Sequence, residues 1–101
     1  MAAKHSLATA IRTVRKARGL NQEAFSDVSS RTYMSSLERG LKSPTLHKLV
    51  ELCGVMEIHP LTLLTLAYAG NSPSKADELL AQIRRELEAV LSGRDETKSR
   101  T

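Results

Sequence analysis

Apolar residues recur every three or four positions along most of the chain, with polar residues between them. This spacing is typical of amphipathic α-helices, and no segment shows the strict alternation of a half-buried strand. The pattern predicts an all-α protein, with helices at about 4–18, 22–28, 31–39, 44–53, 60–69 and 73–92.

Glycine and proline mark the expected helix ends. Glycine in the left-handed conformation commonly ends a helix, and proline is tolerated at the first helical position. The sequence therefore predicts a helix end at each of its five glycines, including Gly54, and a helix start at each of its three prolines. Ser43 and Ser72 directly precede Pro44 and Pro73, so these serines are expected to cap the helices that follow.

The same spacing predicts which side chains are buried. The helix expected at 60–69 is apolar over much of its circumference, which indicates a central position. The expected core consists of apolar residues from the first five helices: Leu7, Ala10, Ile11, Val14, Ala17, Ala24, Phe25, Val28, Met34, Leu37, Leu46, Leu49, Val50, Cys53, Leu61, Leu63, Leu64, Leu66 and Ala67.

The last expected helix differs from the others. Its apolar residues are separated by four, three, four and three positions, which is typical of coiled coils. This seam predicts a dimerisation helix, and packing of the helix on its own domain is the alternative. Residues 93–101 contain no apolar side chain and are expected to be disordered. The seam starts at Ala76, and its expected interface residues are Leu80, Ile83, Leu87 and Val90.

Composition and charge narrow the functional classes. The chain has 101 residues, of which 41% are hydrophobic and 26% charged, as expected for one globular domain. Residues 1–44 carry eight Lys or Arg against three Asp or Glu, and residues 45–101 carry seven against eight. A basic N-terminal half favours a polyanionic partner. No segment resembles a secretory signal or a membrane span, so a cytoplasmic, nucleoid-associated protein without membrane contact is expected.

No group of residues indicates catalysis or metal binding. The three histidines are far apart in sequence, and the single cysteine, Cys53, falls on an apolar helix face. The sequence therefore predicts no enzyme activity, no metal and no cofactor. Aromatic residues make up only 3% of the chain, too few to stack single-stranded bases, so double-stranded DNA is the better ligand.

The helix expected at 31–39 carries short hydroxyl side chains flanked by arginines on its outer face, whereas Met34 and Leu37 face inward. Short polar side chains let a helix approach the floor of the major groove, and arginine matches guanine edges or phosphate oxygens. A solvated polar face is the alternative. The residues on this outer face are Arg31, Thr32, Ser35, Ser36 and Arg39.

The arrangement around this helix resembles the Cro and lambda-repressor-like helix-turn-helix family, also called the Xre family. The resemblance covers about residues 7–67. It rests on Gly19-Leu20-Asn21-Gln22-Glu23, Arg31-Thr32-Tyr33-Met34-Ser35, Leu37-Glu38-Arg39-Gly40, Ser43-Pro44-Thr45-Leu46 and Leu52-Cys53-Gly54-Val55.

The resemblance implies a role for each matching residue. Base edges are expected to contact Arg31, Thr32, Ser35 and Ser36, with phosphate binding as the alternative for Arg31. Gln22 is expected to bind a phosphate and to brace the recognition helix. Arg15 and Glu38 are expected to form an ion pair inside the domain. Further phosphate contacts are expected from Arg39, Lys42, Ser43 and Thr45.

One feature departs from the family pattern: the segment between Gln22 and Tyr33 is short and has no glycine in its turn. The second helix or the turn must therefore be shorter. The recognition helix is expected to lie at a slightly different angle.

Together these observations predict a five-helix lambda-repressor-like helix-turn-helix domain at 1–70, an additional C-terminal dimerisation helix at 71–92 and a tail at 93–101. The expected function is that of a bacterial or phage transcriptional repressor that binds a pseudo-palindromic operator as a homodimer. Three alternatives stay open. The first is an antitoxin, with a toxin as its partner, or a restriction-modification controller of the same fold. The second is a helical adaptor that contacts protein, and the third is an enzyme.

Overall fold

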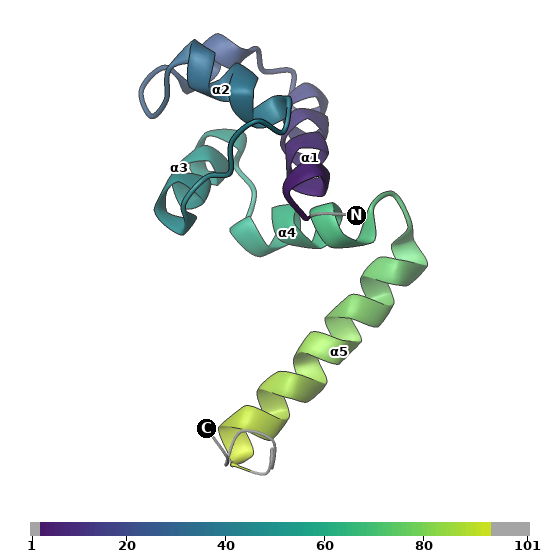
Figure 1. The fold of residues 1–101 in the computed structure, drawn as a ribbon. Coiled ribbons are helices and arrows are strands. Elements are labelled where there is room, and N and C mark those ends of the chain that lie inside the picture. The colour runs from purple at the N-terminus through teal and green to yellow at the C-terminus, as the bar shows by residue number, and fades with distance from the viewer. Residues whose placement is uncertain (1–2, 94–101) are drawn as a thin grey trace.

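The computed structural model describes residues 3–93, which form five α-helices and one short 3-10 helix without any strand. The elements are α1 (Ala3–Ala17), η1 (Gln22–Phe25), α2 (Arg31–Glu38), α3 (Leu46–Met56), α4 (Pro60–Ala69) and α5 (Pro73–Ser92). The all-α prediction is confirmed. Figure 1 shows α1 to α4 gathered in one bundle, from which α5 extends. The tail, predicted to be disordered, lies outside the described residues from position 94 onward.

A single core lies inside the bundle. Six of its side chains have no accessible surface, and every element from α1 to α4 supplies at least one of them: Ile11 of α1, Phe25 of η1, Met34 of α2, Leu52 and Met56 of α3, and Leu63 of α4. Each of these elements is therefore held in place by burial of a large apolar side chain. In contrast, α5 has no buried residue and touches the bundle mainly through α4.

Part of the predicted core is wrong. Ala17 and Ala24 are exposed, and Leu46, Val50 and Leu61 are exposed at 72%, 49% and 61%. Periodicity identifies the apolar face of a helix, but the neighbouring elements decide how much of that face is covered. Figure 1 shows α3 at the edge of the bundle, so only one side of this helix is covered.

The start of α3 differs from the prediction. This helix begins at Leu46 instead of Pro44, and the side chain of Thr45, not that of Ser43, accepts a hydrogen bond from the backbone N–H of Lys48 at 3.1 Å. A threonine hydroxyl in this position satisfies an amide that the helix leaves free, so it sets the first turn.

The end of α3 also differs. The helix passes through Gly54 and ends after Met56, where Glu57 adopts the left-handed conformation with φ of 57°. Met56 is completely buried, and Ile58 lies partly buried against the core. Burial of these apolar side chains favours the extra turn over a helix end at the glycine. Ser72 caps α5, as predicted, by accepting a hydrogen bond from the backbone N–H of Lys75 at 3.2 Å.

Within residues 3–93, no single helix is both long and apolar enough to cross a membrane. By length and composition alone, the pair α3 and α4 would pass that test, but its two helices are bent by 99° relative to each other.

Candidate nucleic-acid interface

A short helical turn and a second helix form the centre of the candidate interface. Asn21 accepts a hydrogen bond from the backbone N–H of Ala24 at 3.0 Å and so starts η1, and Ser30 accepts one from Tyr33 at 3.0 Å and so starts α2. At the other end of α2, Gly40 has φ of 75°, which turns the chain away from the helix axis. Capping residues in the sequence therefore fix both ends of this eight-residue helix.

The connection before α2 is short, as the sequence predicts. The helix expected at 22–28 is reduced to the single 3-10 turn of η1, which has four residues. Phe25 is completely buried and anchors this turn, whereas Val28 is only partly buried. Burial of Phe25 holds η1 against the core, and the chain forms no second helical turn between η1 and Ser30.

Helix α2 has a buried and an exposed face. Met34 and Leu37 are buried in the core, while Arg31 and Thr32 are exposed and Ser35 is half-buried. These exposed residues lie on the outer face expected for contact with base edges.

The expectation that Ser36 also faces outward is wrong, because only 8% of this residue is accessible. Ser36 lies at the flank of the exposed face. There, the neighbouring elements shield a side chain as short as serine, whereas a longer side chain would extend past them.

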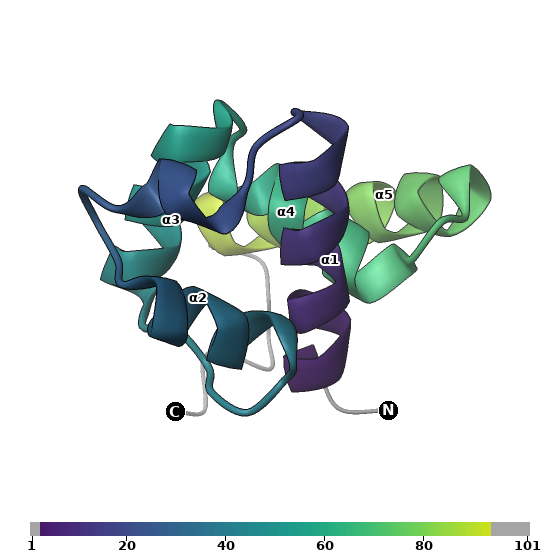
Figure 2. The same cartoon turned by 90° about the horizontal axis from the view of Figure 1, so that it is seen from above.

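The loop after α2 carries further exposed polar residues. Arg39, Lys42, Ser43 and Thr45 are all exposed, and they lie on one continuous segment between α2 and α3. The Thr45 hydroxyl accepts the capping hydrogen bond of α3, so its own proton stays free to be donated. Figure 2 shows α2 and this loop side by side. Figure 1 places α2 and α5 at opposite ends of the molecule.

An ion pair joins α1 to the end of α2. The Glu38 carboxylate accepts hydrogen bonds from Arg15 Nε at 2.6 Å and from Arg15 Nη2 at 2.8 Å, and only 4% of the Glu38 side chain is accessible. The hydrogen bond to Glu38 raises the pKa of Arg15, outweighing the opposite effect of burial. The structure thus brings together the two residues for which an internal pair was expected.

Gln22 belongs to the same network. Its Nε2 donates to Glu38 Oε1 at 3.2 Å, which links the start of η1 to the end of α2. Gln22 is half-buried and lines a small pocket together with Arg15, Glu23 and Arg31. The side chain therefore braces α2 from a position next to Arg31 at the start of that helix.

Arg12 of α1 and Arg18, which follows α1 directly, have structural contacts that sequence reasoning missed. Arg12 Nη1 donates to the backbone oxygen of Glu38 at 3.1 Å, and Arg18 Nε donates to the backbone oxygen of Met56 at 2.9 Å. Both acceptors lie at helix C-termini, where the helix dipole favours a cation. The sequence offered one signal for these contacts. Each of the arginines at 12, 15 and 18 follows the previous one by three residues, which places them near one side of the first helix.

These contacts change the interpretation of the charge pattern. Three of the basic residues in the N-terminal half, Arg12, Arg15 and Arg18, donate hydrogen bonds to groups at helix ends, so part of their donor capacity is used within the fold. Among the expected site residues, Arg31, Arg39 and Lys42 remain as exposed cations near α2. The charge count alone therefore does not separate the arginines that bind helix ends from the cations beside α2.

Glu23 of η1 also lies at this surface and was missed. Its carboxylate oxygen is 3.5 Å from Arg31 Nη1, and the two side chains are 69% and 73% accessible. An ion pair this exposed contributes little to stability. It does place the Arg31 guanidinium beside η1, on a side chain that stays largely exposed.

The described residues offer little for other chemistry. Among residues 3–93, no three His, Cys, Asp or Glu side chains gather closely enough to hold a metal ion. Cys53 is 1% accessible, and burial raises the pKa of its thiol, which disfavours the reactive thiolate.

Comparison with protein families decides the classification. A family model described as Helix-turn-helix matches residues 11–63, which is just over half of the chain. The chain belongs to this Xre-like helix-turn-helix family. The match includes η1 and α2, and membership supports a DNA-binding transcriptional regulator. The predicted lambda-repressor-like fold is confirmed.

Solved structures agree on the fold. Two crystal structures of the clp gene regulator ClgR from Corynebacterium glutamicum each align with a TM-score of 0.65. The first is 23% identical and covers 72% of this chain and 97% of the ClgR chain. The second is 21% identical and covers 94% and 98%. At these identities the likeness establishes the fold alone. Comparison with curated protein sequences gives no match.

Proposed function

We propose that this helix-turn-helix protein is a sequence-specific transcriptional repressor that binds a pseudo-palindromic operator in double-stranded DNA as a homodimer. The observation that carries the proposal is the exposed face of α2, where Arg31 and Thr32 project to solvent at the start of a capped helix. In helix-turn-helix proteins, the N-terminal residues of the second helix contact base edges in the major groove.

The proposed contacts divide into two sets. Arg31, Thr32 and Ser35 read base edges, and the Arg31 guanidinium pairs with O6 and N7 of a guanine. Ser36 is too buried to take part. The second set contacts phosphates and fixes the position of the protein on the duplex without reading the sequence. It consists of Gln22, Arg39, Lys42, Ser43 and Thr45.

The homodimer is supported by the apolar seam on α5. Leu80, Ile83, Leu87 and Val90 are 51%, 37%, 54% and 44% accessible, so the predicted seam faces solvent in the single chain. The alternative, packing of this helix along its own bundle, does not match these exposures. Leaving such a row of large apolar side chains in water is unfavourable, and a second copy with the same seam would cover it.

A two-fold dimer also suits the DNA geometry. Two copies related by a two-fold axis would present two α2 helices to successive major grooves, about 34 Å apart along one face of the duplex. In this proposal the protein acts in the cytoplasm on the nucleoid, and its activity is binding and not catalysis.

Selection of bound duplexes from a random pool, followed by sequencing, tests the proposal. We expect the full chain to enrich two inverted half-sites with centres about 10 base pairs apart. A Lys42→Ala variant should enrich the same sequence with a lower yield, because Lys42 is assigned to a phosphate. Recovery of duplexes without any shared sequence would contradict sequence-specific binding.

A further inference from the structure

We infer that two copies of the chain pair through α5 in an antiparallel arrangement, in the register that places Asp77 of each copy beside Arg84 of the other. This inference rests on the homodimer of the proposed function and adds its orientation and register. It is carried by three features of α5: the apolar seam, the charges beside the seam and the groove at its N-terminal end.

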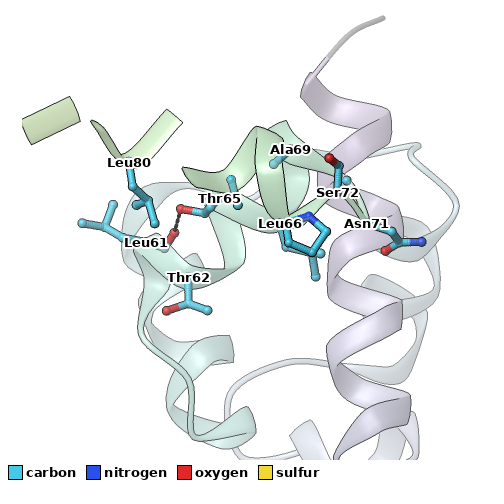
Figure 3. A pocket seen from close by; sticks show the side chains of 11 residues that line it. Leu61, Thr62, Thr65, Leu66, Ala69, Asn71, Ser72 and Leu80 are labelled. Atoms are coloured by element: carbon cyan, nitrogen blue, oxygen red, sulfur yellow. Dashed lines mark hydrogen bonds between the residues drawn. The ribbon is translucent and has the colours of Figure 1, made fainter. Parts of the chain in front are cut away.

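The groove lies between α4 and the first half of α5. Its volume is about 470 Å³, and Figure 3 shows Leu61 and Thr65 of α4 near Leu80 of α5 across it. Its apolar lining includes Leu61, Leu66, Ala69, Pro73, Ala76 and Leu80. Because Ala76 and Leu80 begin the seam, the groove and the seam form one continuous apolar surface that extends along α5.

The charges beside the seam follow from helix geometry. Asp77 and Arg84 each come one residue after a seam position, so they border one edge of the seam. Leu79 and Glu86 each come one residue before a seam position, so they border the other edge. The first edge therefore carries one negative and one positive charge, seven residues apart.

In an antiparallel pair with its two-fold axis between residues 81 and 82, Leu80 of one copy lies against Ile83 of the other. Ala76 then lies against Leu87, and Pro73 against Val90. The two-fold axis repeats each of these contacts, so the register uses the whole seam. Asp77 of one copy and Arg84 of the other border the same edge, offset by two residues or about 3 Å along the axis, which gives two ion pairs across the interface.

The other antiparallel registers place like charges together. A shift of seven residues in one direction brings Arg84 beside Arg84 of the other copy and Glu86 beside Glu86. The opposite shift brings Asp77 beside Asp77. Each of these registers also leaves part of the seam uncovered. Charge complementarity therefore selects the register centred between residues 81 and 82.

A parallel pair is also a poorer match. In a parallel coiled coil, edge residues of the two helices meet in pairs. One residue of each pair comes directly before a seam position, and the other, in the partner, comes directly after the next seam position. This would place Leu79 beside Arg84 and Glu86 beside Leu91, so no pair of opposite charges would form. The antiparallel register also places Glu86 beside Leu79, but it forms the two Asp77–Arg84 pairs.

The groove supplies the last argument for the antiparallel pair. In the selected register, the C-terminal half of the second α5 lies over the groove, with Leu91 near Gly70. Leu91 is 82% accessible, more than any other large apolar residue in the described chain. Each α5 would then lie between α4 and α5 of the other copy, which covers both the groove and Leu91.

Charge reversal measured by analytical ultracentrifugation without DNA tests the inference. Asp77→Arg and Arg84→Asp should each weaken dimerisation about tenfold, because two exposed ion pairs become two repulsions. The double variant D77R/R84D should recover the wild-type dissociation constant. Glu78→Arg and Arg85→Glu are matched controls, since these residues have the same spacing and charges but lie away from the seam; they should leave dimerisation unchanged.

Cysteine cross-linking tests the orientation independently. An equimolar mixture of Ala76→Cys and Leu87→Cys chains should form the mixed disulfide, whereas Val90→Cys alone should not cross-link to itself. The wild-type chain, whose single cysteine is buried, serves as the control. Self-linking of V90C, or failure of D77R/R84D to restore the dimer, would overturn the inference.

The two levels of proposal can fail separately. Dimers with the stated charge rescue that select no DNA sequence would contradict the proposed function and leave the inference standing. A monomer that still enriches one DNA sequence would overturn the inference and the homodimer, while sequence-specific binding would stand.

Discussion

Arg15 and Glu38 join α1 to the last residue of α2 through two hydrogen bonds of 2.6 and 2.8 Å. Both carboxylate oxygens of Glu38 accept these hydrogen bonds, and Gln22 of η1 donates a third one to the same carboxylate. The pair therefore fixes the direction of the recognition helix relative to the bundle. The Arg15 guanidinium is charged throughout the physiological range, as in any arginine, and the hydrogen bond to Glu38 raises its pKa further.

We expect Glu38→Ala to lower the free energy of unfolding by about 3 kcal/mol, because it leaves the nearly buried Arg15 charge without its partner. Chemical denaturation followed by circular dichroism measures this change. The double variant R15M/E38L removes both charges and should be more stable than E38A. A double variant less stable than E38A would show that the hydrogen-bonded network stabilises the fold more than apolar side chains in its place.

Two glycines should respond to the same substitution in opposite directions. Gly54 lies inside α3, and a methyl group added there would meet no atom within 4 Å. We expect Gly54→Ala to stabilise the protein by about 0.5 to 1 kcal/mol, because alanine has less backbone freedom to lose on folding. Thermal denaturation is the measurement.

Gly19→Ala is the matched control. Its added methyl group would also meet no atom within 4 Å, but Gly19 has φ of 72°, where an L-residue is strained. We expect this variant to be destabilised by about 1 kcal/mol. Equal effects of the two substitutions would show that backbone conformation does not decide the outcome.

Arg31 and Lys42 should affect DNA binding in different ways. Arg31→Ala should cost about 1 to 3 kcal/mol of binding free energy on the selected operator and relax the preference at one base position in each half-site. Lys42→Ala should weaken binding to all duplexes and lower the slope of log affinity against log salt by about 1 for each copy bound. Fluorescence anisotropy with operator and random duplexes at several salt concentrations separates the two effects. A uniform loss for R31A would assign Arg31 to a phosphate, together with Lys42.

Cys53 gives a prediction for the pH dependence of stability. Burial raises the pKa of its thiol in the folded chain, whereas the unfolded chain titrates near the ordinary value of about 8.5. Above that pH the unfolded state releases its proton first, so the contribution of Cys53 to stability should decline as the pH rises toward the folded-state pKa. Unfolding at pH 7 to 10 should therefore show a steeper decline for the wild type than for Cys53→Ala. Parallel curves would contradict this.

Local rules account for much of the structure around η1 and α2. The side chains of Asn21 and Ser30 cap the starts of η1 and α2, and Gly40, which has no side chain, ends α2. The Arg15–Glu38 pair was expected from the resemblance to a family and not from any local pattern. No local rule indicated that Glu23 would lie beside Arg31, because the contact depends on how η1 meets α2.

The wrong predictions concern residues whose local sequence pattern conflicts with the tertiary arrangement. Gly54 carries the usual signal for a helix end, but the buried side chain of Met56 continues α3 for another turn. Leu46 and Val50 fit the apolar face of a helix, yet α3 lies at the edge of the bundle and leaves them exposed. In both cases the outcome depends on which parts of the chain, distant in sequence, cover the residue or leave it exposed.

By itself, the sequence determined the helical class, most helix ends and the apolar seam on α5, because these depend on residues within a few positions of one another. Only the tertiary structure decided which arginines hold helix ends and which face solvent, that Ser36 is covered, and that the seam is exposed beside a groove. Those outcomes depend on which helices lie next to each other, and that arrangement is set by burial of the shared core.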